Sequence, residues 1–174
     1  LTYEDRERIY RDISNINKNA ELKLDGFKEF ISKQSDLLKN TIIFVNTTKQ
    51  GNSFIPSISK YTRDYKTYFQ GEDSIALKRF AEGRIECLIA CHRVSEGIDI
   101  RSLNNIFLVS SDASSLETIQ RIGRCLRTDP NNPAKRANII DFVLDYDGNE
   151  KFDEQITDHR RAMWLSELSE VEAK

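Results

Sequence analysis

Short apolar runs, separated by polar turn residues, recur along this 174-residue chain. They are rich in β-branched and aromatic side chains, and most do not alternate with polar residues. Continuous runs of this kind are typical of strands buried on both faces, as in a parallel sheet that helices cover. The predicted strands are 41–45, 66–69, 87–90, 105–109 and 138–143.

Helical patterns lie between and outside these runs. One is predicted at 74–82 and another at 114–127, which opens with a capping-box pattern at Ser114 and Glu117. Alternation of strand and helix predicts an α/β layered fold with right-handed crossover connections.

Two outer segments, 2–16 and 150–171, also carry apolar residues at helical spacing. The simplest interpretation is that these faces pack against the sheet or against a neighbouring domain. The alternative for the second segment is that Trp164 provides a stacking platform for a nucleic-acid base.

Composition favours a soluble, cytoplasmic protein with no membrane partner. No apolar run approaches the ~20 residues that cross a bilayer, and the first residues lack the pattern of a secretory signal. The formal charge of −2 argues against a surface that is basic throughout, although a local basic patch is compatible with it. Because the chain starts at Leu1 and its only methionine is Met163, we expect it to be part of a longer protein.

The three cysteines, Cys87, Cys91 and Cys125, lie in apolar segments. An odd number in such positions favours reduced thiols over a disulfide framework. Cys87, Cys91 and His92 are close in sequence and raise the question of a metal ion. No second Cys/His pair stands at zinc spacing, so no metal site is predicted.

A row of polar side chains distinguishes the predicted helix at 114–127. Gln120, Arg124 and Arg127 stand at i, i+4 and i+7 and therefore share one face. Guanidinium groups are planar, permanently charged and suited to phosphate oxygens. The alternative is a solvated basic face on a surface helix.

A second candidate segment, 90–100, directly follows a predicted strand. In parallel α/β sheets the loops after the carboxyl ends of strands contact ligands. Gly97 permits a close backbone approach, and the carboxylate of Asp99 stands between two isoleucines. The alternative is an ordinary turn with a capping aspartate.

Nucleotide-binding glycine loops of the G-x-x-x-x-G-K-[ST] and G-x-G-x-x-G types do not occur in the sequence. No DEAD- or DEAH-like acidic tetrapeptide occurs either. We therefore expect that this domain is not the primary phosphate cradle of a nucleotide-binding protein.

The two candidate segments, in this order and at this spacing, resemble motifs V and VI of superfamily 2 helicases. The run TIIFVNTTKQG at 41–51 is similar to motif IV, and 68–90 is similar to the stretch that follows it. The resemblance covers about residues 41–143. The form QRIGRCLR resembles DNA-handling members, the XPB-like and restriction-enzyme motor groups, more than DEAD-box RNA helicases, whose motif VI usually begins with His.

This resemblance implies a RecA-like three-layer α/β/α domain with a mostly parallel sheet. Residues 1–174 then form one helicase C-terminal lobe, with a helical lead-in at 1–40 and a C-terminal helix at 150–174. ATP and Mg²⁺ would be held mainly by a first RecA-like lobe of the same parent chain.

The resemblance also implies roles for the matching residues in ATP hydrolysis. Arg124 and Arg127 correspond to arginine fingers that contact the γ-phosphate, and Gln120 lies near the same phosphates. A finger supplied from the opposite lobe ties hydrolysis to closure of the cleft. The implied nucleotide-binding residues are Gly97, Asp99 and Arg121.

Nucleic-acid contacts in the resembling family fall on motif IV and the start of motif V. The matching residues are Asn46, Thr47, Thr48, Arg93 and Ser95. Motif V usually carries Thr at the position of Cys91, and a thiol is a weak donor to phosphate.

The predicted function is ATP-dependent unwinding of DNA, or translocation on it, by a parent protein whose second lobe is this chain. The chain alone is predicted to be inactive as an ATPase. One alternative is a restriction or remodelling motor that moves on duplex without unwinding it. Another is a non-catalytic RecA-like module whose arginine row binds a phosphorylated or acidic protein.

Overall fold

A five-stranded sheet organises the computed structural model of the chain, which describes residues 3–6, 8, 21–91, 103–109, 123, 131, 136–143 and 157–168. The strands are β1 (Thr41–Val45), β2 (Tyr65–Tyr68), β3 (Cys87–Cys91), β4 (Asn105–Leu108) and β5 (Asn138–Asp141). The helices are α2 (Glu21–Lys33), α3 (Thr48–Ile58), α4 (Ile75–Ala81) and α6 (Thr157–Leu168), and a 3-10 helix, η1 (Ser35–Leu38), follows α2.

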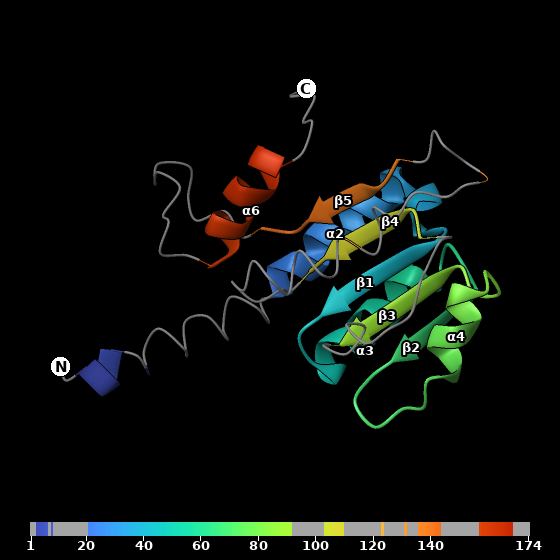
Figure 1. Cartoon of the computed structure of the whole chain (residues 1–174), viewed down its shortest axis with the longest axis horizontal. Coiled ribbons are helices and arrows are strands. Elements are labelled where there is room, and N and C mark those ends of the chain that lie inside the picture. Colours follow the sequence, from blue (N-terminus) through green and yellow to red (C-terminus); the bar gives the residue numbers. More distant parts are fainter. Residues whose placement is uncertain are drawn as a thin grey trace.

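Every strand pairing in the described sheet is parallel, in the order β2-β3-β1-β4-β5. The arrowheads accordingly point the same way in Figure 1. β1 is central, with Ile43 opposite Ile89 of β3 and Phe107 of β4. All five residues of β1 are buried, as its continuous apolar run predicts. The prediction of a mostly parallel sheet is confirmed.

One face of the sheet packs against α2 and α3. Alternate residues of β1, β3 and β4 form a core with both helices on this side. The Phe27 ring of α2 meets Phe54 of α3 and Phe107 of β4 edge to face, with centroids 4.8 and 5.8 Å away. Such aromatic pairs each add roughly 0.5–1.5 kcal/mol beyond the burial of area, so the cluster holds both helices on the sheet.

The opposite face packs against α4. Leu77 and Phe80 of α4 are buried against Leu88 of β3 and Ile106 of β4. Leu165 of α6 packs against the same core, while α6 as a whole lies beyond the arrowhead of β5 (Figure 1). The prediction that helices cover both faces is confirmed.

The predicted strands agree with the observed ones to within two residues at each end. α4 falls within the helix predicted at 74–82, and α6 falls within the one predicted at 150–171. The predicted helix at 114–127 lies outside the described residues except for Gly123, which is helical. None of the helices in the described ranges is long and apolar enough to cross a membrane.

α3 is not among the predicted helices, and it contains the weak helix formers Gly51, Asn52 and Pro56. Tertiary packing explains the glycine. A Cβ at position 51 would stand 2.5 Å from the Phe69 ring, so only glycine lets α3 approach the end of β2 this closely.

Candidate functional site

The polar segment that follows β1 lies at the carboxyl edge of the sheet. Because all strands are parallel, their carboxyl ends meet at this edge, where ligands of open α/β sheets bind. We call residues 46–50, which join β1 to the first turn of α3, the β1 loop. It contains the predicted nucleic-acid contacts Asn46, Thr47 and Thr48, of which the two threonines are exposed.

Thr47 is the N-cap of α3. Its backbone is extended, with φ −135° and ψ 156°, and its Oγ1 accepts a hydrogen bond from the backbone N–H of Gln50 at 3.1 Å. A hydroxyl has one proton to donate and two lone pairs to accept. The cap uses one lone pair, so the hydroxyl proton of Thr47 can still be donated to an incoming oxygen.

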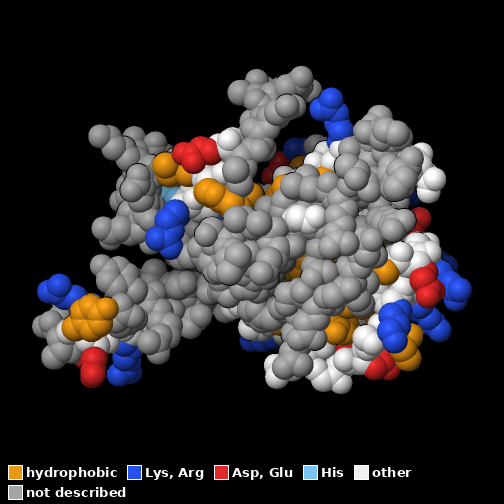
Figure 2. All heavy atoms as spheres, in the orientation of Figure 1, with side chains coloured by type: hydrophobic (Ala, Val, Ile, Leu, Met, Phe, Trp, Pro, Cys, Tyr) orange, Lys and Arg blue, Asp and Glu red, His pale blue; other side chains and the backbone are white. Residues whose placement is uncertain are grey.

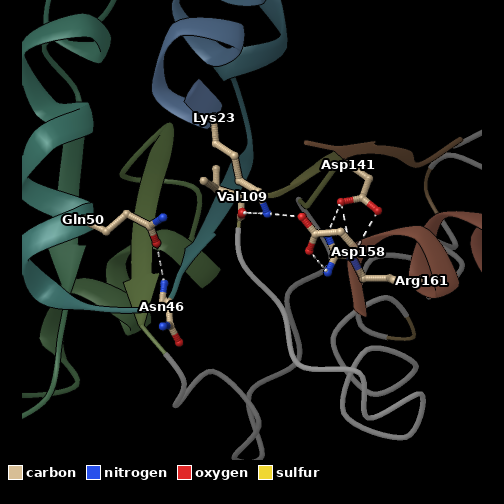
Figure 3. Close-up of polar contacts among 7 residues, drawn as sticks. All are labelled: Lys23, Asn46, Gln50, Val109, Asp141, Asp158 and Arg161. Atoms are coloured by element: carbon tan, nitrogen blue, oxygen red, sulfur yellow. Dashed lines mark hydrogen bonds and ion pairs between the residues drawn. The ribbon is translucent and has the colours of Figure 1, made fainter. Parts of the chain in front are cut away.

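The backbone of Asn46 is bonded on both sides. Its N–H donates to Oε1 of Gln50 at 2.8 Å, and its carbonyl accepts from Sγ of Cys91 at 3.0 Å. Figure 3 shows Gln50 reaching from α3 to the Asn46 backbone, while the Asn46 side chain points away from Gln50. The loop is therefore tied both to α3 and to the end of β3.

The first turn of α3 carries no acidic side chain. The positive end of the helix dipole is therefore not neutralised by a carboxylate within that turn, and Lys49 adds a further positive charge there. Exposed hydroxyls, a lysine and helix N–H groups at one point form an arrangement that suits an anionic oxygen.

Sequence reasoning missed Lys49 and Gln50, although a signal for both was present. The run Thr47-Thr48-Lys49-Gln50 has the S/T-x-x-E/Q form of a capping box. That pattern marks the start of a helix, and it would have placed Lys49 in the first turn. Here the Gln50 side chain reaches one residue further back than usual, to Asn46.

A cavity of about 690 Å³ lies between α2 and α3, next to the β1 loop. Thr47, Lys49 and Gln50 line it on one side, and Lys28 and Asp25 of α2 line it on the other. The Lys28 and Asp25 side chains are paired at 3.1 Å. Because its wall carries charges of both signs, the cavity by itself does not select an anion.

The thiol of Cys87 in the core is kept protonated by its surroundings. Burial, and to a smaller extent the nearby Glu86 carboxylate, raise the pKa of the Cys87 thiol to about 12. In the part of the chain that the structure describes, no three His, Cys, Asp or Glu side chains are grouped so that they could hold a metal ion. His92 lies outside the described residues.

A second polar assembly lies at the same edge, beyond β4 and β5. We call Lys23, Asp141, Asp158 and Arg161 the ion cluster. Lys23 of α2 pairs with Asp158 of α6 and donates to the carbonyl of Val109 at 3.1 Å. Arg161 contacts Asp158 at 3.0 Å and Asp141, the last residue of β5, at 2.6 Å (Figure 3).

The ion cluster is internally compensated. Two cations face two carboxylates, and Lys23, Asp158 and Arg161 are each less than 5% exposed. Burial lowers the pKa of Lys23, against the opposing effect of Asp158. Burial of Arg161 alone would lower its pKa, but Asp141 and Asp158 together raise it, so the guanidinium stays charged.

The face around α4 carries mixed charge. Figure 2 shows basic and acidic side chains interspersed there. Lys78, Arg79 and Arg84 are exposed close to Glu82, which pairs with Arg84 at 3.2 Å. This part of the surface therefore offers no extended field of one sign.

The other predicted site residues lie outside the described residues. The structure brings Asn46 of the β1 loop together with Cys91, the second residue of the 90–100 segment. The roles of the remaining residues stay predictions. They are Arg93, Ser95, Gly97, Asp99, Gln120, Arg121, Arg124 and Arg127.

The five-stranded parallel sheet between helices matches the RecA-like α/β fold of helicase C-terminal domains. The C-terminal domain of the DEAD-box protein Dbp5 has this fold, with a TM-score of 0.61 and 21% identity over 89% of this chain and 83% of that chain. T4 UvsW matches with a TM-score of 0.59 and 16% identity, over 96% of this chain and 35% of that chain.

The family follows from the sequence match. The model of the helicase conserved C-terminal domain matches residues 22–129, more than half of the chain. The chain belongs to this family of superfamily 2 helicase domains. The ATP-dependent RNA helicase vasa of Drosophila melanogaster is 29% identical over 131 residues, which cover 72% of this chain and 19% of that protein. The chain thus spans about a fifth of the length of this relative.

Proposed function

We propose that this chain is the second motor lobe of an ATP-dependent nucleic-acid helicase or translocase. The β1 loop is the observation that carries the proposal. It presents two exposed threonines and Lys49 at the carboxyl edge, on a backbone that internal hydrogen bonds already hold. Such donors suit the oxygens of a sugar–phosphate backbone.

The ATP-dependent step in this proposal rests on the family and on the sequence motif. Arg124, Arg127 and Gln120 would act on the γ-phosphate, and Gly97, Asp99 and Arg121 would line the nucleotide side of the cleft. The residues that hold ATP and Mg²⁺ would belong mainly to a first lobe. Closure of the two lobes would then bring the fingers to the phosphate and couple hydrolysis to movement.

The choice between DNA and RNA turns on groups other than the phosphates. Phosphate contacts from the β1 loop carry no information about the sugar, whereas a contact to the 2′-hydroxyl does. The form of motif VI, like that of the XPB-like and restriction-enzyme motors, supports DNA. The name of the vasa relative supports RNA. Binding must therefore be measured with both.

The experiment compares two exposed lysines at opposite ends of α3. Lys49 lies in the first turn, at the carboxyl edge, and Lys60 lies just past the last turn, at the other edge. We expect Lys49→Ala to weaken binding of fluorescent single-stranded 20-mers of DNA or RNA, and to reduce the salt slope by about 1. Lys60→Ala should leave both quantities unchanged. Equal binding by wild type and Lys49→Ala would contradict the proposed role of the β1 loop.

A further inference from the structure

Three elements meet at the backbone of Asn46. The residue directly follows β1, it is bonded to Gln50 of α3, and it is bonded to Cys91 at the end of β3. The exposed residues Thr47 and Thr48 follow it directly. The position of the loop that carries their hydroxyls therefore depends in part on a hydrogen bond between Asn46 and Cys91, which are 45 residues apart in sequence.

Gln50 holds the β1 loop from the α3 side. Its side-chain oxygen accepts from Asn46, and its own backbone N–H donates to the Thr47 hydroxyl, so the two bonds close the turn from opposite directions. Gln50 as a whole is only 8% exposed, and it lines the cavity beside the loop. A ligand at the loop would meet the threonines before it met Gln50.

Cys91 holds the loop from the β3 side. It is the last residue of β3, it lies opposite Val45 of β1, and it is 8% exposed. Its thiol donates to the Asn46 carbonyl at 3.0 Å, which directs the donor into the protein. The thiol at this position therefore forms a hydrogen bond with the residue that follows the neighbouring strand, β1.

We propose that Gln50 and Cys91 are positioning residues, which hold Asn46, Thr47 and Thr48 in the conformation that binds a sugar–phosphate backbone. This inference rests on the proposed function. A loop that is ordered before binding does not lose that conformational freedom when the ligand arrives. Neither positioning residue needs to touch the nucleic acid for its loss to weaken binding.

The test uses a pair of substitutions at Cys91 in the 174-residue chain. Cys91→Val keeps an apolar side chain in the core and removes the donor, whereas Cys91→Ser keeps a donor in a smaller side chain. We expect Cys91→Val to raise the Kd for fluorescent single-stranded 20-mers about threefold, near the low end of the range for one hydrogen bond, because a thiol is a weak donor. Cys91→Ser should bind within about twofold of wild type.

A second variant tests the α3 side by a readout that does not need nucleic acid. Gln50→Met removes the acceptor for the Asn46 N–H and retains an unbranched side chain. We expect faster hydrogen exchange at the Asn46 amide, together with a Kd raised about threefold to tenfold. An unchanged exchange rate would overturn the role of Gln50.

The outcomes separate the two proposals. If Lys49→Ala weakens binding but Cys91→Val and Gln50→Met bind like wild type, the positioning role is wrong and the proposed function stands. If Cys91→Val and Cys91→Ser weaken binding equally, Cys91 acts through packing and its positioning role is overturned. If Lys49→Ala also binds like wild type, the proposed role of the β1 loop itself fails.

Discussion

The β1 loop and the ion cluster lie at the same edge of one sheet and use their polar groups in opposite ways. In the ion cluster, the charges of Lys23, Asp158 and Arg161 are buried and paired with one another or with Asp141. In the β1 loop, the internal hydrogen bonds involve the Asn46 backbone and one lone pair of Thr47, while exposed side chains remain on the surface.

This difference separates a structural assembly from a candidate site. Taking charges out of water is costly, so a buried cluster with zero net charge is stable only while all its members are present. It joins α2, β5 and α6 and offers no net charge to a ligand. The β1 loop instead has a hydrogen-bonded backbone beneath donors that face solvent, an arrangement that lowers the entropic cost of binding.

The largest expected effect concerns the arginines that are predicted to act in ATP hydrolysis. In a protein that carries both lobes, Arg124→Ala or Arg127→Ala should lower ATP turnover by about 10³–10⁵, because a finger neutralises charge that develops in the transition state. Nucleic-acid binding and the free energy of unfolding should change little. A steady-state ATPase assay measures the loss, with Arg101→Ala as the control outside the motif.

Lysine should be a poor substitute at either finger, since a point charge does not reproduce the two-pronged guanidinium. Near-normal turnover in both alanine variants, with loss of an acidic or phosphorylated protein partner, would support the non-catalytic binding module instead.

The next largest effect concerns the ion cluster. Asp158→Ala leaves two buried cations, Lys23 and Arg161, with a single carboxylate, Asp141, to balance their charge. This variant should lower the free energy of unfolding by about 3–5 kcal/mol. Urea denaturation followed by circular dichroism measures this change. As a control, Asp25→Ala removes the exposed carboxylate of the Asp25–Lys28 pair. It should lower the free energy of unfolding by less than about 1 kcal/mol. Similar losses in the two variants would show that the buried cluster does not hold α6.

The smallest effect tests the β1 loop at its cap. Thr47→Asp should keep the free energy of unfolding within about 0.5 kcal/mol of wild type, because aspartate caps a helix as well as threonine does. The added negative charge should nonetheless raise the Kd for single-stranded nucleic acid about fivefold, as like charges ~4 Å apart in water cost about 1 kcal/mol. Thr47→Ser keeps both the cap and the hydroxyl and should match wild type. A large loss of stability in Thr47→Asp would contradict the separation of cap and binding donor.

The sheet could be predicted from the sequence because a strand that is buried on both faces has a continuous run of apolar residues. Runs such as TIIFV at 41–45 and CLIA at 87–90 need no partner to be recognised, and both are strands in the structure. The sequence signal for α3 is weaker. Gly51 and Pro56 lower its helix propensity, while the contact with Phe69 that requires glycine lies outside any local pattern.

The sequence by itself determined the parallel α/β architecture, the family and the position of the β1 loop after a buried strand. Each of these depends on residue types within a short stretch of chain, where hydrophobic period and motif spacing can be read directly. Only the tertiary structure decided which polar groups are partners. Lys23 meets Asp158 and Asn46 meets Cys91 across long sequence separations, because packing of α2, α6 and the strands brings them together. Periodicity tells which side chains are buried, but a buried charge or carbonyl takes whichever partner the folded chain places within reach.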